Sequence, residues 1–196
     1  MATPSPQRFA ALTDAAIALI AESGMRGLTH RAVDARAGLP AGTTSAYLRT
    51  RKALIEAVVQ RLAQLDAADL TDRALPADAA VLSAGIAAVL DDWLTTGRTR
   101  TLARYACLLE ATHHPELRTI LAYGVTMREQ ARELLSAFGA PDPEQRGRHF
   151  VAAVDGLLFD RLIGAGALSS PLPGTPESRA DLTAAVHRLL TAATAP

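Results

Sequence analysis

Apolar residues return every three or four positions along most of the chain, which is the period of an amphipathic helix. Phe9, Leu12, Ala16, Leu19 and Ile20 mark a first helix that ends at Gly24. Further helices are predicted over residues 29–38, 41–48, 50–64 and onward, 77–96, 99–112, 115–138, 143–164 and 176–193. Corners rich in glycine and proline separate them. The pattern therefore predicts an all-α fold of about nine helices.

Two short helical patterns meet at a Gly-Leu-Pro corner within residues 28–54. The Thr29 side chain can accept a hydrogen bond at the start of one helix, and Gly38 can adopt the left-handed conformation that ends it. Pro40 sets the direction in which the next helix begins, and Thr50 is placed to cap a longer third helix. The N-terminal part of the chain is thus predicted to be a three-helix, helix-turn-helix domain, followed by a helical C-terminal bundle.

Hydroxyl groups and cations surround this corner. The second short helix carries small side chains, so that its backbone could approach a DNA groove closely, and cations that can bind phosphate follow it at once. The same geometry also occurs in helical bundles that bind no nucleic acid, which leaves a purely structural role as the alternative. The residues expected to contact DNA are Thr29, His30, Arg31, Ala41, Gly42, Thr43, Thr44, Ser45, Ala46, Tyr47, Arg49, Arg51 and Lys52.

The N-terminal region resembles the DNA-binding domain of the TetR family of bacterial transcriptional regulators. That family has a Thr-Arg helix start, an Ala-Gly-aliphatic corner, a Gly-Thr helix with an aromatic end, and a Ser-Lys start of the next helix. Here these features stand at residues 29–31, 37–39, 42–48 and 50–51. The resemblance implies that Arg31 reaches a base edge or a nearby phosphate. It also implies that Thr43 and Tyr47 bind phosphates and that Arg51 holds the DNA backbone.

Two residues depart from this resemblance. Asp34 stands where the family packs a small alanine, and Thr44 replaces a leucine. A carboxylate at position 34 needs a partner, and Arg31 and Arg36 are the nearest candidates. Because residues 45–46 are small, we expect sequence specificity to depend on Arg31, Thr44 or the shape of the DNA.

The charge is unevenly distributed, although the net charge is zero. Residues 1–64 hold eight basic and four acidic residues, a balance of +4, and the remainder holds twelve basic and sixteen acidic residues, a balance of −4. A basic module on an acidic body suits binding to a polyanion. We predict a DNA-binding domain over residues 1–50, a connecting helix over 51–75, and a ligand-binding and dimerisation domain over 76–196.

The composition also bears on the compartment. No apolar run approaches the roughly 20 residues of a membrane span, and the polar, proline-bearing residues 1–7 do not look like a signal peptide. The single cysteine, Cys107, has no partner for a disulfide within the chain. We expect a cytoplasmic protein that does not bind a membrane.

The last two predicted helices carry apolar residues that can form a dimer interface. One face can pack on the body of the protomer while another contacts a second copy, or the same residues can simply close the core of one protomer. The resemblance favours the dimer, because TetR-family members are generally dimers built through their two C-terminal helices. The residues expected at the interface are Phe150, Val154, Leu158, Leu182, Val186 and Leu189.

The middle helices are expected to enclose a mostly apolar ligand pocket with a few polar groups. Its candidate residues are Trp93, Arg104, Tyr105, Leu108, Tyr123, Met127, Asp155 and Phe159. Each also has a structural interpretation, since aromatic residues at helical spacing are more often core residues. Arg104 could likewise form a buried pair with Glu110 or Asp155.

The sequence lacks a recognisable catalytic or metal-binding set. His113 and His114 are adjacent, so they point about 100° apart on a helix, and Cys107 has no evident base beside it. We predict no enzyme, no metal and no cofactor. The favoured function is a homodimeric transcriptional repressor that binds a double-stranded DNA operator and is released by an unknown small-molecule effector. A helical protein-binding adaptor and a small helical enzyme are the alternatives, and the cations near residues 49–52 disfavour the adaptor.

Overall fold

The computed structural model describes residues 5–70, 78–114, 117–118 and 122–195, and ten α-helices lie within these ranges. This described part of the chain contains no strand, which confirms the all-α prediction. The helices form two compact units. One consists of Met1–Thr71 with Thr99–Ala122, and the other of Asp72–Arg98 with Tyr123–Pro196.

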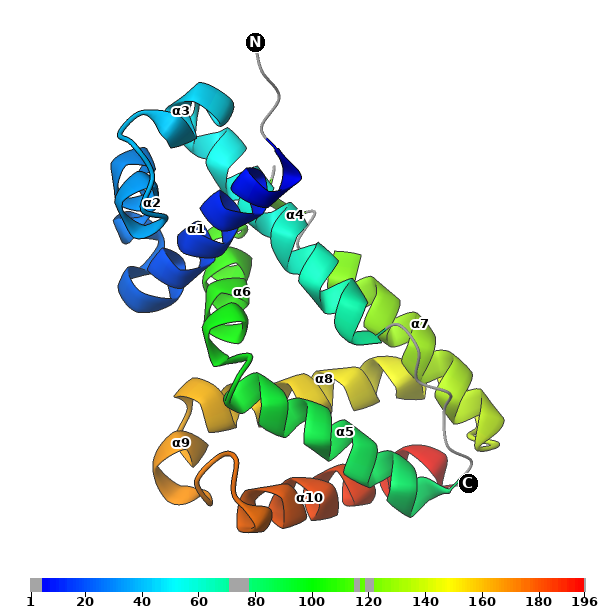
Figure 1. Ribbon diagram of the computed structural model, residues 1–196. Coiled ribbons are helices and arrows are strands. Elements are labelled where there is room, and N and C mark those ends of the chain that lie inside the picture. Colours follow the sequence, from blue (N-terminus) through cyan, green and yellow to red (C-terminus); the bar gives the residue numbers. More distant parts are fainter. Residues whose placement is uncertain (1–4, 71–77, 115–116, 119–121, 196) are drawn as a thin grey trace. The chain divides into compact units, whose positions relative to one another are not determined.

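The first unit holds α1 (Pro6–Gly27), α2 (His30–Arg36), α3 (Thr43–Tyr47), α4 (Arg51–Leu70) and most of α6 (Arg98–Glu110) (Figure 1). α1 packs on both α2 and α4, and α2 packs on α3. One apolar core joins these helices, and its buried members include Leu12, Ile20, Leu28, Val33, Leu54, Leu62, Ala103 and Cys107. This core fixes the helix-turn-helix on α1 and α4.

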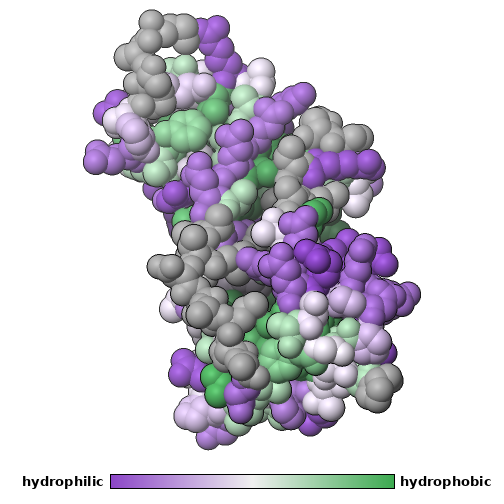
Figure 2. All heavy atoms as spheres, turned by 90° about the vertical axis from the view of Figure 1, so that its right-hand side faces the viewer, coloured by the Kyte–Doolittle hydropathy of each residue, from purple (hydrophilic) through white to green (hydrophobic). Residues whose placement is uncertain are grey.

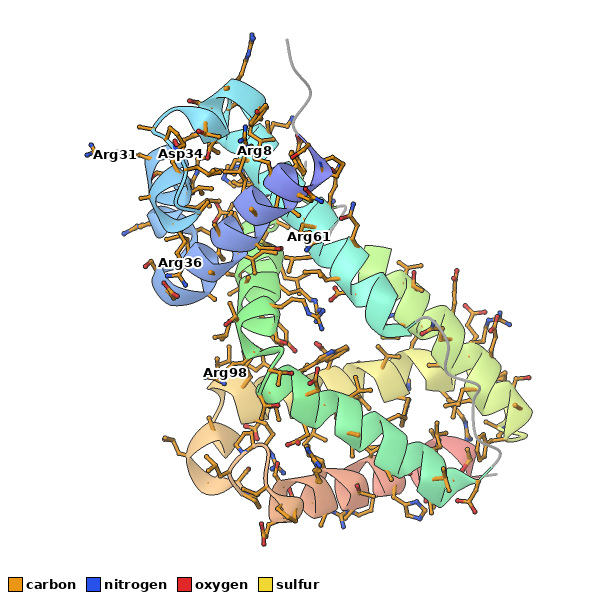
Figure 3. The ribbon with its side chains drawn as sticks, viewed as in Figure 1. Arg8, Arg31, Asp34, Arg36, Arg61 and Arg98 are labelled. Atoms are coloured by element: carbon orange, nitrogen blue, oxygen red, sulfur yellow. The ribbon has the colours of Figure 1, made fainter. Side chains whose placement is uncertain are left out.

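Two arginines connect α1 to other helices of the first unit (Figure 3). Arg36 of α2 donates to the two carboxylate oxygens of Glu22 at 2.9 and 2.7 Å. Arg61 of α4 donates to Asp14 at 2.8 and 3.1 Å. Because these pairs are partly or largely exposed, each contributes only about 0–1 kcal/mol, and they orient the helices more than they stabilise them.

The second unit holds α5 (Ala79–Leu94), α7 (Ala122–Ala137) except its first residue, α8 (Pro143–Ile163), α9 (Gly166–Ser169) and α10 (Pro176–Thr194). α10 packs most closely on α5 and also on α8. Their facing stripes are apolar, and their fully buried members include Leu90, Leu158, Leu162, Leu182, Val186 and Leu190.

Asp91 fastens the loop before α10 to α5. Its side chain is buried and accepts hydrogen bonds from the Gly174 N–H at 2.8 Å, the Ser178 hydroxyl at 3.3 Å and Arg179 Nε–H at 2.8 Å. Burial by itself raises the pKa of Asp91, but the bonds from Arg179, Gly174 and Ser178 hold that pKa below its usual value. The start of α10 is therefore held by a charged group on α5.

The predicted helix boundaries agree with the structure in most places. The helices predicted over 77–96, 99–112, 143–164 and 176–193 are α5, α6, α8 and α10, with ends shifted by at most two residues. α1 breaks at Gly24, which has φ +66°, but a further turn follows to Gly27.

Three other boundaries need comment. The helix predicted from residue 115 is described from Ala122, and residues 115–116 and 119–121 lie outside the described part. α9 lies within residues 164–176, which were predicted to form a loop. The sequence does not predict this helix, because four residues are too few to show a helical period. The boundary expected near Pro76 also lies outside the described residues, so the functional division of the chain stays a prediction.

Candidate nucleic-acid interface

The helix-turn-helix begins and ends at the residues that its sequence predicts. The Thr29 hydroxyl accepts a hydrogen bond from the Ala32 N–H at 3.1 Å. Gly38 has φ +64° after the end of α2, which a residue with a side chain rarely adopts. The Thr50 hydroxyl accepts from the Ala53 N–H at 3.1 Å at the start of α4. The two hydrogen bonds and the conformation of Gly38 confirm the expected caps.

α3 receives its cap from a different helix. It is five residues long, and Gly42 before it, with φ +90°, has no side chain to offer. Asp34 of α2 replaces that missing side chain. Its Oδ2 accepts from the Gly42 N–H at 2.7 Å, and its Oδ1 accepts from the Thr44 N–H at 2.7 Å and from the Thr44 hydroxyl at 2.5 Å.

The Asp34 carboxylate is a buried charge with compensating donors. Only 2% of the residue is exposed. Burial by itself raises the pKa of Asp34, but the hydrogen bonds from Thr44 and Gly42 and the nearby His30 hold that pKa below its usual value. The carboxyl group therefore stays ionised at neutral pH and binds the start of α3 as an anion.

The expected partners of Asp34 were wrong. Arg36 binds Glu22, and Arg31 projects outward from α2 in Figure 3. The two departures from the TetR pattern, Asp34 and Thr44, are instead hydrogen-bonded to each other. Thr44 is 0% exposed, and both its hydroxyl and its N–H are bound to Asp34. Its side chain is not placed to contact a base, which removes Thr44 from the predicted DNA contacts.

Arg51 is engaged within the protein. Its guanidinium donates to the carbonyl oxygens of Leu28 and Met25 at the C-terminal end of α1. Those carbonyls have no partner along the helix, so a cation is favourable there. The group expected to hold the DNA backbone thus joins α4 to α1 instead.

Three other predicted contacts also have intramolecular bonds. His30 Nε2–H donates to the Leu48 carbonyl at 2.5 Å, which joins the start of α2 to the end of α3. The Thr43 hydroxyl donates to the Pro40 carbonyl at 2.6 Å, and the Ser45 hydroxyl donates to the Gly42 carbonyl at 3.1 Å. Each hydroxyl would have to turn before it could donate to a phosphate.

Several of the predicted residues lie on the surface of the helix-turn-helix. Arg31 on α2, Ser45 and Ala46 on α3, and Lys52 at the start of α4 are exposed, and Tyr47 is half-buried. We call these residues the α3 surface. Lys52 Nζ lies 3.9 Å from a Glu56 carboxylate oxygen in an exposed pair, which leaves the ammonium group accessible to an anion. Thr29, Ala41, Gly42 and Arg49 are exposed as well.

The predicted ligand residues are divided between the two units. Arg104, Tyr105 and Leu108 lie on α6 in the first unit, and Arg104 Nε donates to Asp66 at 3.1 Å. Asp66 is thus the partner, in place of Glu110 or Asp155. The second unit holds Trp93, Met127, Asp155 and Phe159, and the side chain of Tyr123 lies outside the described part. Trp93 and Tyr105 are buried, whereas Asp155 and Phe159 are exposed. A shared pocket stays a prediction.

A cavity of about 420 Å³ lies within the second unit, and none of the eight predicted ligand residues lines it. The ends of α5 and α8, α9 and the loop before α10 surround it. Arg98 donates to the Leu162 carbonyl at 3.4 Å, and Arg161 is paired with Asp181. Neither of these two lining arginines belongs to a sequence motif, so the sequence does not predict them as site residues.

Most of the predicted dimer residues face the core of one protomer. Phe150, Leu158, Leu182 and Val186 are buried, and Val154 and Leu189 are half-buried. The four buried residues have almost no area left to bury against a second copy, and the place of all six residues at an interface stays a prediction. On α8, α9 and the loop before α10, four large apolar residues are exposed: Phe159, Ile163, Leu168 and Leu172. We call these four residues the α8–α9 patch. Leu168 is 95% and Leu172 74% exposed. These two leucines were missed because they lie in the predicted loop.

Among the residues that the structure describes, no group of three or more His, Cys, Asp or Glu side chains could hold a metal ion. No single described helix is long and apolar enough to span a membrane, although α5 and α6 together pass that test as a bent pair. Polar residues cover much of the face drawn in Figure 2, with apolar residues in smaller areas between them.

The chain is similar to known regulators. Residues 77–192 match the family model "Tetracyclin repressor-like, C-terminal domain". The HTH-type transcriptional regulator BetI of Burkholderia thailandensis is 31% identical over 166 residues, which cover 81% of this chain and 84% of that protein.

Solved structures agree with this result. A transcriptional regulator from Rhodococcus sp. Rha1 superposes with a TM-score of 0.75 at 25% identity, covering 98% of this chain and 100% of that one. The multidrug binding protein EbrR complexed with ethidium superposes with a TM-score of 0.66 at 27% identity, covering 93% and 98%. Together with the capped helix-turn-helix, these likenesses show that the chain belongs to the TetR family of transcriptional regulators.

Proposed function

We propose that this DNA-binding regulator places α3 in the major groove, with Arg31 at a base edge and Lys52 at a phosphate. The α3 surface supports this assignment, because small exposed side chains let the helix backbone approach the bases while a cation stands on each neighbouring helix. Arg51 is assigned to the fold of the domain, since its guanidinium is bound by the carbonyls of α1.

The regulator acts as a homodimer that uses the α8–α9 patch. Solvent-exposed Phe159, Ile163, Leu168 and Leu172 supply apolar area that one protomer leaves uncovered. A two-fold dimer brings the same patch of each copy together and presents two α3 helices to one face of the duplex. Dimerisation thereby doubles the contacts that a single short helix can make.

The regulator represses transcription until a small molecule binds between helices of its predicted ligand-binding domain, residues 76–196. The EbrR–ethidium complex supports a ligand with an aromatic body, because that structure covers almost this entire chain. Such a ligand releases DNA only to the extent that it binds the released conformation more tightly than the DNA-bound one. A thermal-shift screen of aromatic cations with full-length protein tests this step. The expected result is a higher unfolding temperature with at least one compound that also weakens DNA binding.

The DNA contacts are tested by measuring the affinity of the full-length protein for two labelled duplexes over a range of salt concentrations. One is a duplex that the parent protein enriches from a random pool, which we call the selected duplex, and the other has a random sequence. Arg31→Ala lowers affinity for the selected duplex by about tenfold and relaxes sequence preference. Lys52→Ala weakens both complexes equally and reduces the salt slope by about 1.

Arg128→Ala provides the charge-matched control, because Arg128 is an exposed arginine on α7 in the other unit. This variant is expected to bind both duplexes like the parent. If Arg31→Ala and Lys52→Ala also bind like the parent, the assigned DNA contacts are wrong.

A further inference from the structure

α3 is too short to hold its own conformation. An isolated helix below about 12 residues is marginal in water, and α3 has five. Its first N–H groups have no partner along the helix, and its cap residue is a glycine. The direction of α3 relative to α2 must therefore be set by contacts from outside the helix.

Asp34 provides the most specific of these contacts. Its two carboxylate oxygens bind the backbone on both sides of Thr43, at Gly42 and Thr44, so they fix both the position and the direction of the first turn. The hydroxyl of Thr44 adds a third bond to Oδ1 of the same carboxylate. A two-oxygen acceptor constrains rotation of the helix in a way that apolar packing alone would not.

We propose that Asp34 and Thr44 act together as positioning residues that orient α3 for sequence readout, without touching DNA themselves. Both are buried below the α3 surface, so neither can contribute a contact to a base. Loss of either member lets α3 rotate or fray. Specific binding then suffers, while the phosphate contacts that give non-specific affinity remain. The proposal rests on the proposed entry of α3 into the groove.

The two residues are also coupled. Removing Asp34 leaves the Thr44 hydroxyl buried without its acceptor, and removing the hydroxyl leaves the carboxylate with two donors instead of three. A buried polar group that loses its partner is costly, whereas loss of both partners is cheaper than the sum of the single losses. The effects of the two substitutions should therefore not multiply.

The test compares Thr44→Val, Thr44→Ser, Asp34→Ala and the double variant Asp34→Ala with Thr44→Val in the full-length protein. For each, the affinity for the selected duplex is divided by the affinity for the random duplex, at a temperature at which circular dichroism shows the helices intact. Thr44→Val, which keeps the shape of the side chain, lowers this ratio by about tenfold, and random-duplex affinity stays within a factor of about two. Thr44→Ser keeps the hydroxyl and retains the ratio of the parent. The double variant is no worse than Asp34→Ala.

Glu22→Gln is the matched control. It weakens the bond between α1 and Arg36 in the same domain but touches neither Gly42 nor Thr44, so it retains the ratio. If Asp34→Ala unfolds, the pair Thr44→Val and Thr44→Ser decides alone. A parental ratio in folded Thr44→Val, or a double variant whose loss equals the product of the single losses, would overturn the coupled positioning role. A parent that binds neither duplex would contradict the DNA-binding role itself, and this proposal with it.

Discussion

Burial and hydrogen bonding act in opposite directions on the Asp34 carboxyl. Burial favours the neutral acid, whereas donors from Thr44 and Gly42 favour the anion, and the pKa lies below its usual value because the donors outweigh burial. A carboxyl whose pKa is depressed by folding stabilises the folded state at any pH above its unfolded pKa. That stabilisation is lost as the pH falls through the lower, folded value.

The contribution of Asp34 should therefore be visible as a pH-dependent difference between the parent and Asp34→Asn. From neutral pH down to about pH 5, the difference in free energy of unfolding stays constant, because the carboxyl is ionised in both states. Below about pH 4 the difference shrinks. Urea unfolding at a series of pH values measures it. A difference that grows on acidification would mean that folding raises this pKa.

A second prediction concerns the reactivity of the Cys107 thiol. The thiol is fully buried, and burial together with Glu110 raises its pKa to about 12. Only the thiolate reacts readily with disulfide reagents, so folded protein should react with an aromatic disulfide far more slowly than protein unfolded in guanidinium. The released thiolate reports the rate. Equal rates in the two states would show that Cys107 is accessible in the folded protein.

Single residues were only partly predictable from the sequence. The caps at Thr29, Gly38 and Thr50 follow from local rules, and the structure confirms them. The partner of Asp34 does not follow from local rules, because the backbone N–H groups of α3 become available only after the turn folds over α2. Proximity in the sequence suggested Arg31 and Arg36 as partners of Asp34. In the folded domain its carboxylate instead accepts from the N–H groups of Gly42 and Thr44.

Helices depend on contacts between elements as well as on their own sequences. α5 and α10 illustrate this, since Asp91 on α5 accepts bonds from Gly174, Ser178 and Arg179 around the start of α10. Both helices were predicted from the sequence to within two residues of their ends. The three hydrogen bonds to Asp91 were not predicted. The residues involved are more than eighty positions apart.

Asp91→Ala tests the importance of that contact. It leaves the Gly174 N–H and the buried Ser178 hydroxyl without their acceptor and should lower the free energy of unfolding by about 2 kcal/mol. Arg179→Ala is the control. Because Arg179 is 64% exposed, its loss should cost less than about 1 kcal/mol. Chemical denaturation measures both, and equal losses would mean that the ion pair, not the backbone bond, matters.

Assembly into a dimer depends on the apolar residues that stay exposed after one protomer has folded. Apolar periodicity predicted which helices are amphipathic, but it could not separate a residue that closes the protomer from one that meets a second copy. Leu182 and Val186 belong to the first kind, and Ile163 and Leu168 remain exposed. Periodicity shows that a face is apolar, and only the packed structure shows what covers it.

Ile163→Glu should therefore shift the protein from dimer to monomer. A charge in the α8–α9 patch would have to be buried in the dimer without a partner. Leu109→Glu is the control, because Leu109 is also an exposed apolar residue but lies on α6 in the first unit. Sedimentation velocity measures the association state. A dimeric Ile163→Glu variant would contradict the proposed interface.

The entry of α3 into the major groove is tested most directly by methylation protection on the selected duplex. Dimethyl sulfate modifies guanine N7, which lies in the major groove. Binding of the full-length protein should protect guanines in two half-sites whose centres lie one helical turn, about 34–36 Å, or a multiple of it apart. Bound protein that leaves every guanine N7 as reactive as in free duplex would contradict the account.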